Sequence, residues 1–431
     1  MKVAADQSAR KDFEGSDLIV AEEQTVSYGN PTLRFTHRTA RVTVVLTDYT
    51  EERMFVRLTG LSTENGNPAQ ITPYNKGGDT YTALVAPQSV ATGTAFITCK
   101  FTNGKVFVYK MKNDTDWQAG KEYTYTVSLA AAKDPGYTVS EDGKTYTVTS
   151  ADGLLAWNEA VQKDMTLNCT LADNIDLTGK DWTPIGTSFG NSYTGTFDGN
   201  GKTITGLTVT GSDRYTGLFG FIKGTVKNVV LTEINITSGT FVGGVAGWSF
   251  GGNIEHCSVS GSVSGSDVGG VVGYQQGGSI TGCSSSATVK GTQRAGGVAG
   301  TTNSGATLTA CYATGDVTVE NDGTSNAWAG GVVGSNAYST VIACYAAGNV
   351  SGTGSGTIHV GGVTGENFDG TLTACYWSGL PDNDNGGATK VDGTTVTWQT
   401  AVAAMNAALS GKGWQYELKD GNSLPTLKKE Q

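Results

Sequence analysis

The segment GGVAG, residues Gly243–Gly247, returns four times: as GGVVG at Gly269–Gly273, GGVAG at Gly296–Gly300, GGVVG at Gly330–Gly334 and GGVTG at Gly361–Gly365. In every copy a cysteine follows the second glycine by 13 or 14 residues. Fixed internal spacing at a period of 26 to 34 residues predicts a solenoid. Each repeat holds three short strand-like pieces separated by turn residues, so one repeat should form one triangular coil of a parallel β-helix.

The composition of the whole chain agrees with a folded β protein. Glycine accounts for 62 of 431 residues, and charged residues for only 16%, against about 25% in average proteins. A disordered chain would be richer in charge and poorer in aromatic residues. The net charge of −10 and the absence of a basic stripe argue against a nucleic-acid partner. No apolar run approaches the length of about 20 residues that a membrane-spanning helix needs.

The ends of the repeat array should carry small helical caps, because a solenoid has to hide its first and last open coils. We place the β-helix at residues 146–387. LLAWNEAV at Leu154–Val161 is predicted to be the amphipathic cap of the first coil. TAVAAMNAALS at Thr400–Ser410 is the best helical stretch of the chain, so residues 388–431 are expected to form the other cap.

Residues 25–130 have a different pattern, with few glycines and alternating apolar residues in short runs. Examples are RVTVVL at Arg41–Leu46, AFITCKF at Ala95–Phe101 and YTYTVSL at Tyr123–Leu129. Short alternating runs separated by turn signals predict an antiparallel β-sandwich. The overall fold class is therefore all-β: an N-terminal sandwich, a linker at residues 131–145 and a C-terminal β-helix.

Residues 1–24 are polar and lack the apolar core of a signal peptide. We interpret them as a flexible leader. Because the rest of the chain has the character of a surface protein, we expect that a signal peptide was removed before this numbering begins.

The sandwich region resembles a known family. LRFTHRTARVTVVL from Leu33, YTALVAPQSV from Tyr81 and AGKEYTYTVSL from Ala119 occur in the order seen in fimbrillin-like domains of Bacteroidetes surface proteins. Fimbrillins usually have two such domains and this chain shows one. The resemblance implies a fimbrial or cell-surface protein, and any lipid anchor would lie upstream of residue 1.

The repeat region resembles a second family. GGSITGCSSSATVKG at Gly277–Gly291 and TLTACYATGDVTV at Thr307–Val319 are similar to the GLUG-motif repeats of bacterial surface proteins. Such repeats occur in adhesins and also beside peptidase domains. Together the two resemblances imply an adhesin-like protein at the cell surface or outside the cell, anchored to the outer membrane.

Five cysteines recur at matching repeat positions and should form one inward-facing column. Small apolar side chains filling a narrow core are the main interpretation. Disulfides between neighbouring coils and reactive or metal-binding thiols are the alternatives. The column consists of Cys257, Cys283, Cys311, Cys344 and Cys375.

Candidate ligand-binding residues are aromatic. Tyr312, Tyr345 and Tyr376 each follow a column cysteine, so they should face outward as a ladder. The ladder could stabilise the sheet by stacking, or it could bind sugar rings or a partner. Trp248 and Tyr274, at matching positions of neighbouring repeats, and Trp328, near a long turn, could pack on the coil below or belong to a binding surface.

Catalytic motifs are not found. The three histidines are scattered, and the acidic residues of the array do not recur at matching positions. We therefore expect a non-catalytic protein without metal or cofactor, whose β-helix binds a host glycoprotein, a glycan or another surface protein. The alternatives are a structural stalk or fimbrial accessory subunit and, with less support, a carbohydrate-active β-helix enzyme.

Overall fold

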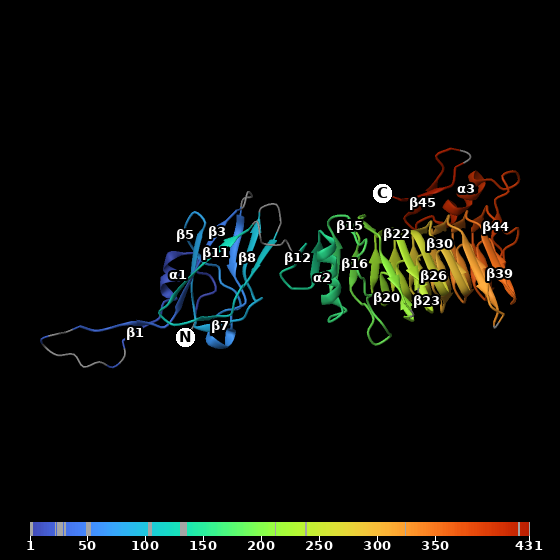
Figure 1. The fold of residues 1–431 in the computed structure, drawn as a ribbon. Helices are drawn as coiled ribbons and strands as arrows, with labels where there is room; N and C mark the ends of the chain where they lie inside the picture. The colour runs from blue at the N-terminus through green and yellow to red at the C-terminus, as the bar shows by residue number, and fades with distance from the viewer. Residues whose placement is uncertain are drawn as a thin grey trace. The chain divides into compact units, whose positions relative to one another are not determined.

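The computed structural model describes residues 3–21, 23, 29, 32–48, 53–101, 106–129, 136–211, 213–237, 239–323, 325–420 and 423–430. The chain divides into two compact units, Met1–Thr138 and Val139–Gln431, and each is described by itself (Figure 1). Within the described ranges no helix has both the length and the apolar character that a membrane crossing requires.

The first unit is the predicted β-sandwich. Its two larger sheets have the orders β11-β3-β6-β5 and β4-β8-β9. Val42, Val44 and Leu46 point into the core between them, as their alternation with more exposed residues requires. One pairing departs from the antiparallel pattern, because β11 runs parallel to β3. The strands are β3 (Ala40–Thr47), β4 (Arg53–Leu58), β5 (Tyr74–Gly77), β6 (Thr80–Val85), β8 (Ala95–Phe101), β9 (Val106–Lys110) and β11 (Glu122–Ser128).

The N-terminal residues are part of this unit, so the flexible leader predicted for residues 1–24 is wrong over most of its length. Val3 lies in the sandwich core. The amide of Gln7 is fully buried, where it donates to the Leu84 carbonyl oxygen and accepts from the Leu84 N–H, both at 2.9 Å. The polar composition of the segment gave no indication that Val3 and Gln7 are buried. The remaining elements are α1 (Arg10–Gly15), β1 (Ile19–Val20), β2 (Thr36–His37), η1 (Thr63–Asn65), β7 (Gln88–Val90) and β10 (Thr115–Trp117).

The second unit begins earlier than residue 146. Residues 131–135 of the predicted linker lie outside the described residues, but β12 (Tyr137–Val139) and β13 (Thr145–Val148) already belong to a solenoid sheet. The helix α2 (Ala151–Val161) follows and is the predicted cap of the first coils. Its Trp157 ring is fully buried and packs 5.2 Å from the ring of Phe197.

The solenoid makes about seven turns in the described part of the chain and confirms the predicted parallel β-helix. Two of its sheets take one short strand from each coil that they cross, and β12 and β13 extend the first of them at its N-terminal end. The first contains β12, β13, β14 (Asn168–Leu171), β16 (Thr196–Asp198), β21 (Thr225–Lys227), β25 (Asn253–Glu255), β28 (Ser279–Thr281), β32 (Thr307–Thr309), β37 (Thr340–Ile342) and β42 (Thr371–Thr373); the second contains β20 (Phe219–Ile222), β24 (Ala246–Phe250), β27 (Val272–Gln276), β31 (Ala299–Asn303), β36 (Val333–Ala337) and β41 (Thr364–Phe368).

A third sheet takes up to three short strands from one coil, so a coil has more pieces than the three predicted. Parallel pairing between equivalent residues of successive coils runs through it. Its described strands are β15 (Ile175–Asp176), β17 (Thr203–Thr205), β18 (Thr208–Thr210), β19 (Tyr215–Thr216), β22 (Val230–Thr237), β23 (Phe241–Gly243), β26 (Ser258–Gly269), β29 (Ser284–Ser285), β30 (Thr288–Gly296), β33 (Tyr312–Ala313), β34 (Val317–Asn321), β35 (Ala327–Gly330), β38 (Tyr345–Ala346), β39 (Val350–Gly354), β40 (Ile358–Gly361), β43 (Tyr376–Trp377) and β44 (Thr389–Lys390).

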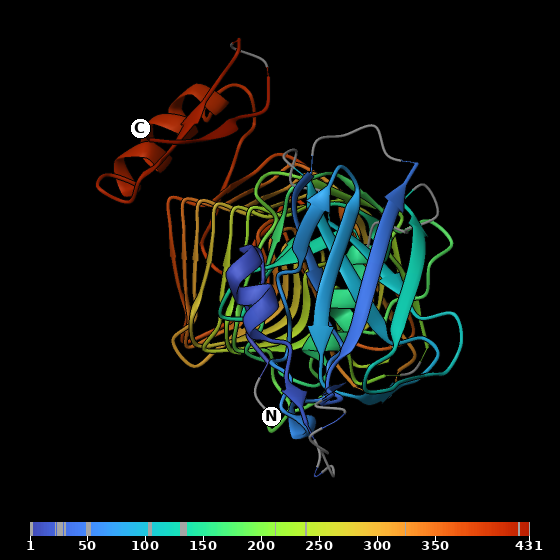
Figure 2. The same ribbon diagram turned by 90° about the vertical axis from the view of Figure 1, so that its left-hand side faces the viewer.

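The cap predicted for residues 388–431 is correct only at its start, where β44 pairs with β43 of the last coil, and the rest of the segment lies beside the coils. Figure 2 shows this segment next to the stacked coils. It consists of α3 (Trp398–Ala408), β45 (Trp414–Glu417) and β46 (Thr426–Lys429). At the last coil, Asp384 accepts hydrogen bonds from the N–H groups of Val363 and Thr364, both at 2.7 Å. A loop, and not a helix, therefore satisfies part of that open edge.

Candidate ligand-binding surface

The five column cysteines point into the solenoid core as free thiols, and each is at most 3% exposed. Their sulfur atoms lie near carbonyl oxygens of the preceding coil, for example Cys283 Sγ at 3.5 Å from Ile254 O. Burial raises the pKa of Cys375 to about 12, although nearby backbone N–H groups act in the opposite direction. These buried thiols fill space in the solenoid core.

The tyrosine ladder forms in the predicted register but is not an open surface. Tyr312 pairs with Tyr345, and Tyr345 with Tyr376. The rings of Tyr312 and Tyr345 are parallel, with centroids 4.9 Å apart. Tyr345 is only 1% exposed, so its predicted exposure is wrong, while Tyr312 and Tyr376 are half-buried.

The C-terminal segment covers the ladder. The Tyr345 hydroxyl donates to the Pro425 carbonyl oxygen at 2.5 Å. Trp398 of α3 packs against the Tyr345 ring, and Tyr416 of β45 donates to the Ala343 carbonyl oxygen at 3.0 Å. Burial raises the pKa of Tyr345. This face of the solenoid is thus an internal packing surface.

On a different face, side chains on both sides of each glycine bend point away from the solenoid core. We call this surface the outer stripe and define it by two rows of register-paired residues. The first row is Tyr215, Phe241, Asp267, Arg294, Trp328 and His359. The second row is Phe221, Trp248, Tyr274, Thr301, Ser335 and Glu366.

The glycine bend brings the two rows together. Phe241 and Trp248 flank the bend at Gly243–Gly247, and their ring centroids lie 5.0 Å apart. A Cβ atom on Gly247 would lie 2.4 Å from the Thr216 backbone nitrogen and 2.8 Å from the Phe241 carbonyl oxygen. Real Cβ atoms do not approach backbone this closely. The repeated glycine is therefore needed for the close approach that lets the two rows meet.

The coils nearest the first unit in sequence carry the aromatic end of the stripe: Tyr215, Phe221, Phe241, Trp248 and Tyr274. Tyr215 and Phe241 are stacked at 5.8 Å, and Trp248 lies 4.6 Å from Tyr274. Phe221 is buried beneath these rings, whereas the other four are half-buried. The Asn303 side-chain amide donates to the Tyr274 hydroxyl at 3.0 Å.

Two cations lie over rings at this end. The Lys223 ammonium is 3.5 Å from the ring centroid of Phe189, which is 58% exposed. The guanidinium carbon of Arg214 is 5.4 Å from the centroid of Tyr215 and 5.9 Å from that of Phe241. Such contacts are favourable because the ring face carries negative potential.

The other end of the stripe is polar. The buried carboxylate of Asp267 accepts from the Arg294 guanidinium at 3.0 Å. Arg294 lies 5.2 Å from the Trp328 ring, and His359 stacks on the far side of that ring at 6.0 Å and 14°. Burial raises the pKa of Asp267, and the charge of Arg294 opposes this shift.

The structure thus brings two predicted site residues together, Trp248 and Tyr274, and places Trp328 at the polar end of the same stripe. Sequence reasoning missed Tyr215, Phe241, Arg294 and His359. A signal for them was present, because every first-row residue precedes the first glycine of its bend by two positions. Aligning the repeats on that glycine would have revealed the row.

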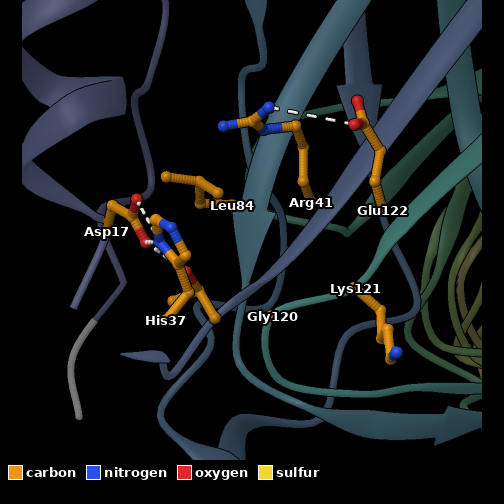
Figure 3. A pocket seen from close by; sticks show the side chains of 8 residues that line it. Asp17, His37, Arg41, Leu84, Gly120, Lys121 and Glu122 are labelled. Carbon is orange, nitrogen blue, oxygen red and sulfur yellow. Dashed lines mark hydrogen bonds and ion pairs between the residues drawn. The ribbon is translucent and has the colours of Figure 1, made fainter. Parts of the chain in front are cut away.

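Two of the cavities among the described residues lie away from the outer stripe. One in the sandwich, of about 140 Å³, has Asp17, His37, Arg41 and Glu122 in its wall. Figure 3 shows that these residues pair with one another, His37 with Asp17 at 2.8 Å and Arg41 with Glu122 at 3.9 Å. The second, of about 230 Å³, lies between the coils and β46, with His256 and Leu427 in its wall. The described residues contain no group of three or more His, Cys, Asp or Glu arranged to hold a metal ion.

Comparison with known families supports both resemblances. Residues 1–152 match the family described as fimbrillin-like. Residues 238–264 and 264–290 match the GLUG motif. The fimbrillin-like match includes residues 3–21, in agreement with their packing in the sandwich.

Similar proteins are as follows. Halomucin of Haloquadratum walsbyi is 35% identical over 108 residues, which are 22% of this chain and 1% of Halomucin. The chain therefore spans about 1% of the length of that relative. A solved Bacteroides ovatus protein, proposed to be an immunoglobulin A1 protease, has a TM-score of 0.53 at 20% identity, over 69% of this chain and 95% of its own.

Two further solved structures are more distant. One named IgA1 protease has a TM-score of 0.45 at 18% identity, over 81% of this chain and 29% of its own. A fimbrial protein from Bacteroides ovatus has a TM-score of 0.20 at 19% identity, over 33% of each chain. The likeness with a TM-score of 0.53 concerns the fold alone. The chain carries an N-terminal fimbrillin-like domain followed by GLUG-motif repeats, and this combination indicates a protein of the cell surface.

Proposed function

We propose that this protein is a non-catalytic, adhesin-like protein of the cell surface, held at the outer membrane, whose solenoid binds carbohydrate on a partner surface. The observation that carries the proposal is the aromatic end of the outer stripe. Four half-buried rings, those of Tyr215, Phe241, Trp248 and Tyr274, lie together on the outward face of successive coils. Clustered exposed aromatic groups mark interaction sites.

The surroundings of these rings suit a sugar ligand. Carbohydrates offer apolar C–H groups and many hydroxyl groups, so they need apolar contact together with a few fixed polar groups. Gln276 and Asn303 pair in register beside the second row, and Asn303 also holds the Tyr274 hydroxyl. Because both rows run from coil to coil, a ligand along them would be extended in the direction of the solenoid axis.

The carboxylates of the stripe support a binding role over a hydrolytic one. Asp267 is buried in its ion pair with Arg294, and Glu366 accepts a hydrogen bond from Ser335 at 2.6 Å. Asp267 and Tyr274 belong to the same coil, and Glu366 lies three coils further along the solenoid. At about 4.8 Å per coil this separation is roughly 14 Å, whereas paired catalytic carboxylates of glycosidases lie about 5 to 10 Å apart.

A structural or accessory role is the second candidate, and one observation favours it. Four large apolar side chains on or next to β1 and β2 are 44 to 59% exposed: Leu18, Ile19, Leu33 and Phe35. Exposed apolar side chains along a short paired ribbon offer contacts to another protein. In that case the ligand would be a fimbrial or other surface protein, and the solenoid would act as a stalk.

A glycan and glycoprotein array with the intact chain tests the proposal. The informative variant is Trp248→Thr/Tyr274→Thr, because Thr301 already occupies the equivalent position two coils beyond Trp248. The matched control is Tyr338→Asn/Phe368→Thr, a pair of exposed aromatics outside the two rows, with asparagine at Tyr338 because the backbone there is left-handed. Binding by the intact chain and the control, and loss in the stripe variant, would support the proposal. Absence of binding by the intact chain would overturn it and favour the accessory role.

A further inference from the structure

We infer that the carbohydrate bound by the outer stripe is anionic, carrying carboxylate or sulfate groups that meet Arg214 and Lys223 at the aromatic end and Arg294 at the polar end. This inference rests on the proposed function and names its ligand class. The three cations lie beside the apolar rings of the stripe or on its first row.

The rings of the stripe form one apolar cluster with mixed orientations. Tyr215 and Phe241 are nearly parallel at 12°, whereas Trp248 and Tyr274 are tilted at 47° and Phe241 meets Tyr274 edge-on at 75°. The cluster therefore offers apolar contact to the carbon skeleton of a sugar. The cations beside the cluster decide which charge on the ligand is favoured.

The cations of the aromatic end extend this surface. Arg214 is exposed, and Lys223 is held over Phe189 and by the Phe189 carbonyl oxygen, to which it donates at 3.0 Å. Among the residues that the structure describes, neither cation forms an ion pair with a carboxylate of the solenoid. Asp213, the neighbour of Arg214 in sequence, is exposed.

The polar end adds the fixed N–H donors of Arg294, whose positive charge is balanced by Asp267. Asp267 is 3% exposed and holds the Arg294 guanidinium, whose side chain keeps 31% of its surface open. A guanidinium has five N–H donors, so donors remain for a ligand after the Asp267 contact. Arg294 lies three register steps beyond Tyr215, which is roughly 14 Å at about 4.8 Å per coil. Glu366 lies two coils beyond the coil of Arg294, at the end of the second row. Its negative charge is therefore separated from the three cations.

The charge of the whole molecule makes this local arrangement informative. With a net charge of −10, the protein should repel a polyanion in general. Binding of an anionic chain would therefore require the local cations of the stripe. The salt dependence should be strong, because contacts between partly exposed charges are screened over about 8 Å at physiological ionic strength.

The test uses the intact chain and three defined polymers: dextran sulfate, polygalacturonate and neutral dextran. We expect both anionic polymers to bind, neutral dextran to bind at least about tenfold more weakly, and binding of the anionic polymers to fall steeply toward 1 M salt, where the screening length is about 3 Å. Comparing sulfate with carboxylate shows which group the site prefers. Equal binding of neutral dextran would overturn the inference and leave the proposed function standing.

Charge variants locate the site. Arg214→Gln/Lys223→Gln should weaken binding of dextran sulfate about tenfold. Lys290→Gln, which removes an exposed charge from the same strand as Arg294 but outside the two rows, is the matched control and should bind as the parent does. At Arg294 the neutral pair Asp267→Asn/Arg294→Gln is used, because it leaves no unpaired buried carboxylate. Unchanged binding in both stripe variants, with circular dichroism showing that they fold, would contradict the inference.

Discussion

Phe241 and Trp248 flank one glycine bend, and their rings lie 5.0 Å apart across it. The two strand arms that carry these rings approach so closely that a Cβ atom at Gly247 would lie 2.8 Å from the Phe241 carbonyl oxygen. A wider bend would move the two rings apart. The conformation of the bend and the outer stripe are therefore one structural feature. Equivalent bends carry the other members of both rows.

Replacing Gly247 by alanine should destabilise the protein. The new methyl group would lie 2.4 Å from the Thr216 backbone nitrogen, so the backbone has to shift, at an expected cost of about 2 kcal/mol. Gly190→Ala is the control, because nothing lies within 4 Å of a Cβ atom there and its backbone is not left-handed. Denaturant unfolding measures both. Equal stability of the two variants would show that the bend tolerates a side chain.

Removing the Tyr345 hydroxyl should weaken the attachment of the C-terminal segment. Tyr345→Phe leaves the Pro425 carbonyl oxygen without its buried donor, which should lower the free energy of unfolding by about 1.5 kcal/mol. Tyr376→Phe, at the next rung of the ladder, should have a smaller effect because that side chain is half-exposed. If both variants unfold at the parent's denaturant midpoint, the segment is held by other contacts.

The Asp267–Arg294 ion pair can be tested by a double-mutant cycle. Arg294→Gln leaves a carboxylate that is 3% exposed without its cation, so a loss of about 3 kcal/mol is expected. The double variant Asp267→Asn/Arg294→Gln removes both charges and should recover most of that loss. If the effects of Arg294→Gln and of Asp267→Asn alone add up to that of the double variant, the pair is not coupled.

Acid should selectively weaken the turn that leads into α3. The N–H groups of Val396, Thr394 and Thr395 donate to Asp392 and lower its pKa to about 2. A depressed folded-state pKa stabilises the protein above the unfolded pKa of about 4, and the contribution is lost as the pH falls toward 2. The variant Asp392→Asn carries a side-chain amide at this position, which does not titrate. The stability advantage of the parent over this variant should therefore shrink between pH 4 and pH 2, and a constant difference would contradict the assignment.

The repeat pattern was sufficient to predict the solenoid, because a side chain at a fixed position in each coil meets the same environment. This explains why the buried column of Cys257 and its equivalents could be located by spacing alone. The register of Tyr312, Tyr345 and Tyr376 followed in the same way.

What the pattern could not give is the position of segments outside the repeat. The apolar faces of α3 and β45 indicate that they pack on something, but the end and the side of a solenoid both offer apolar surface. Tyr345 is buried because the C-terminal segment packs on the side of the solenoid, and the sequence does not indicate that position. The outer stripe was missed for another reason: its first row changes from aromatic at Phe241 to charged at Asp267 and Arg294, so residue type does not repeat although position does.

The affinity of the stripe variant tests the central claim most directly. The ligand that binds the intact chain most tightly on the array is titrated calorimetrically into the parent, into Trp248→Thr/Tyr274→Thr and into the control Tyr338→Asn/Phe368→Thr. If the outer stripe is the binding surface, Kd should rise at least about tenfold in the first variant and stay within about twofold in the control. A folded stripe variant that keeps the parent's Kd would place the ligand elsewhere and contradict the account.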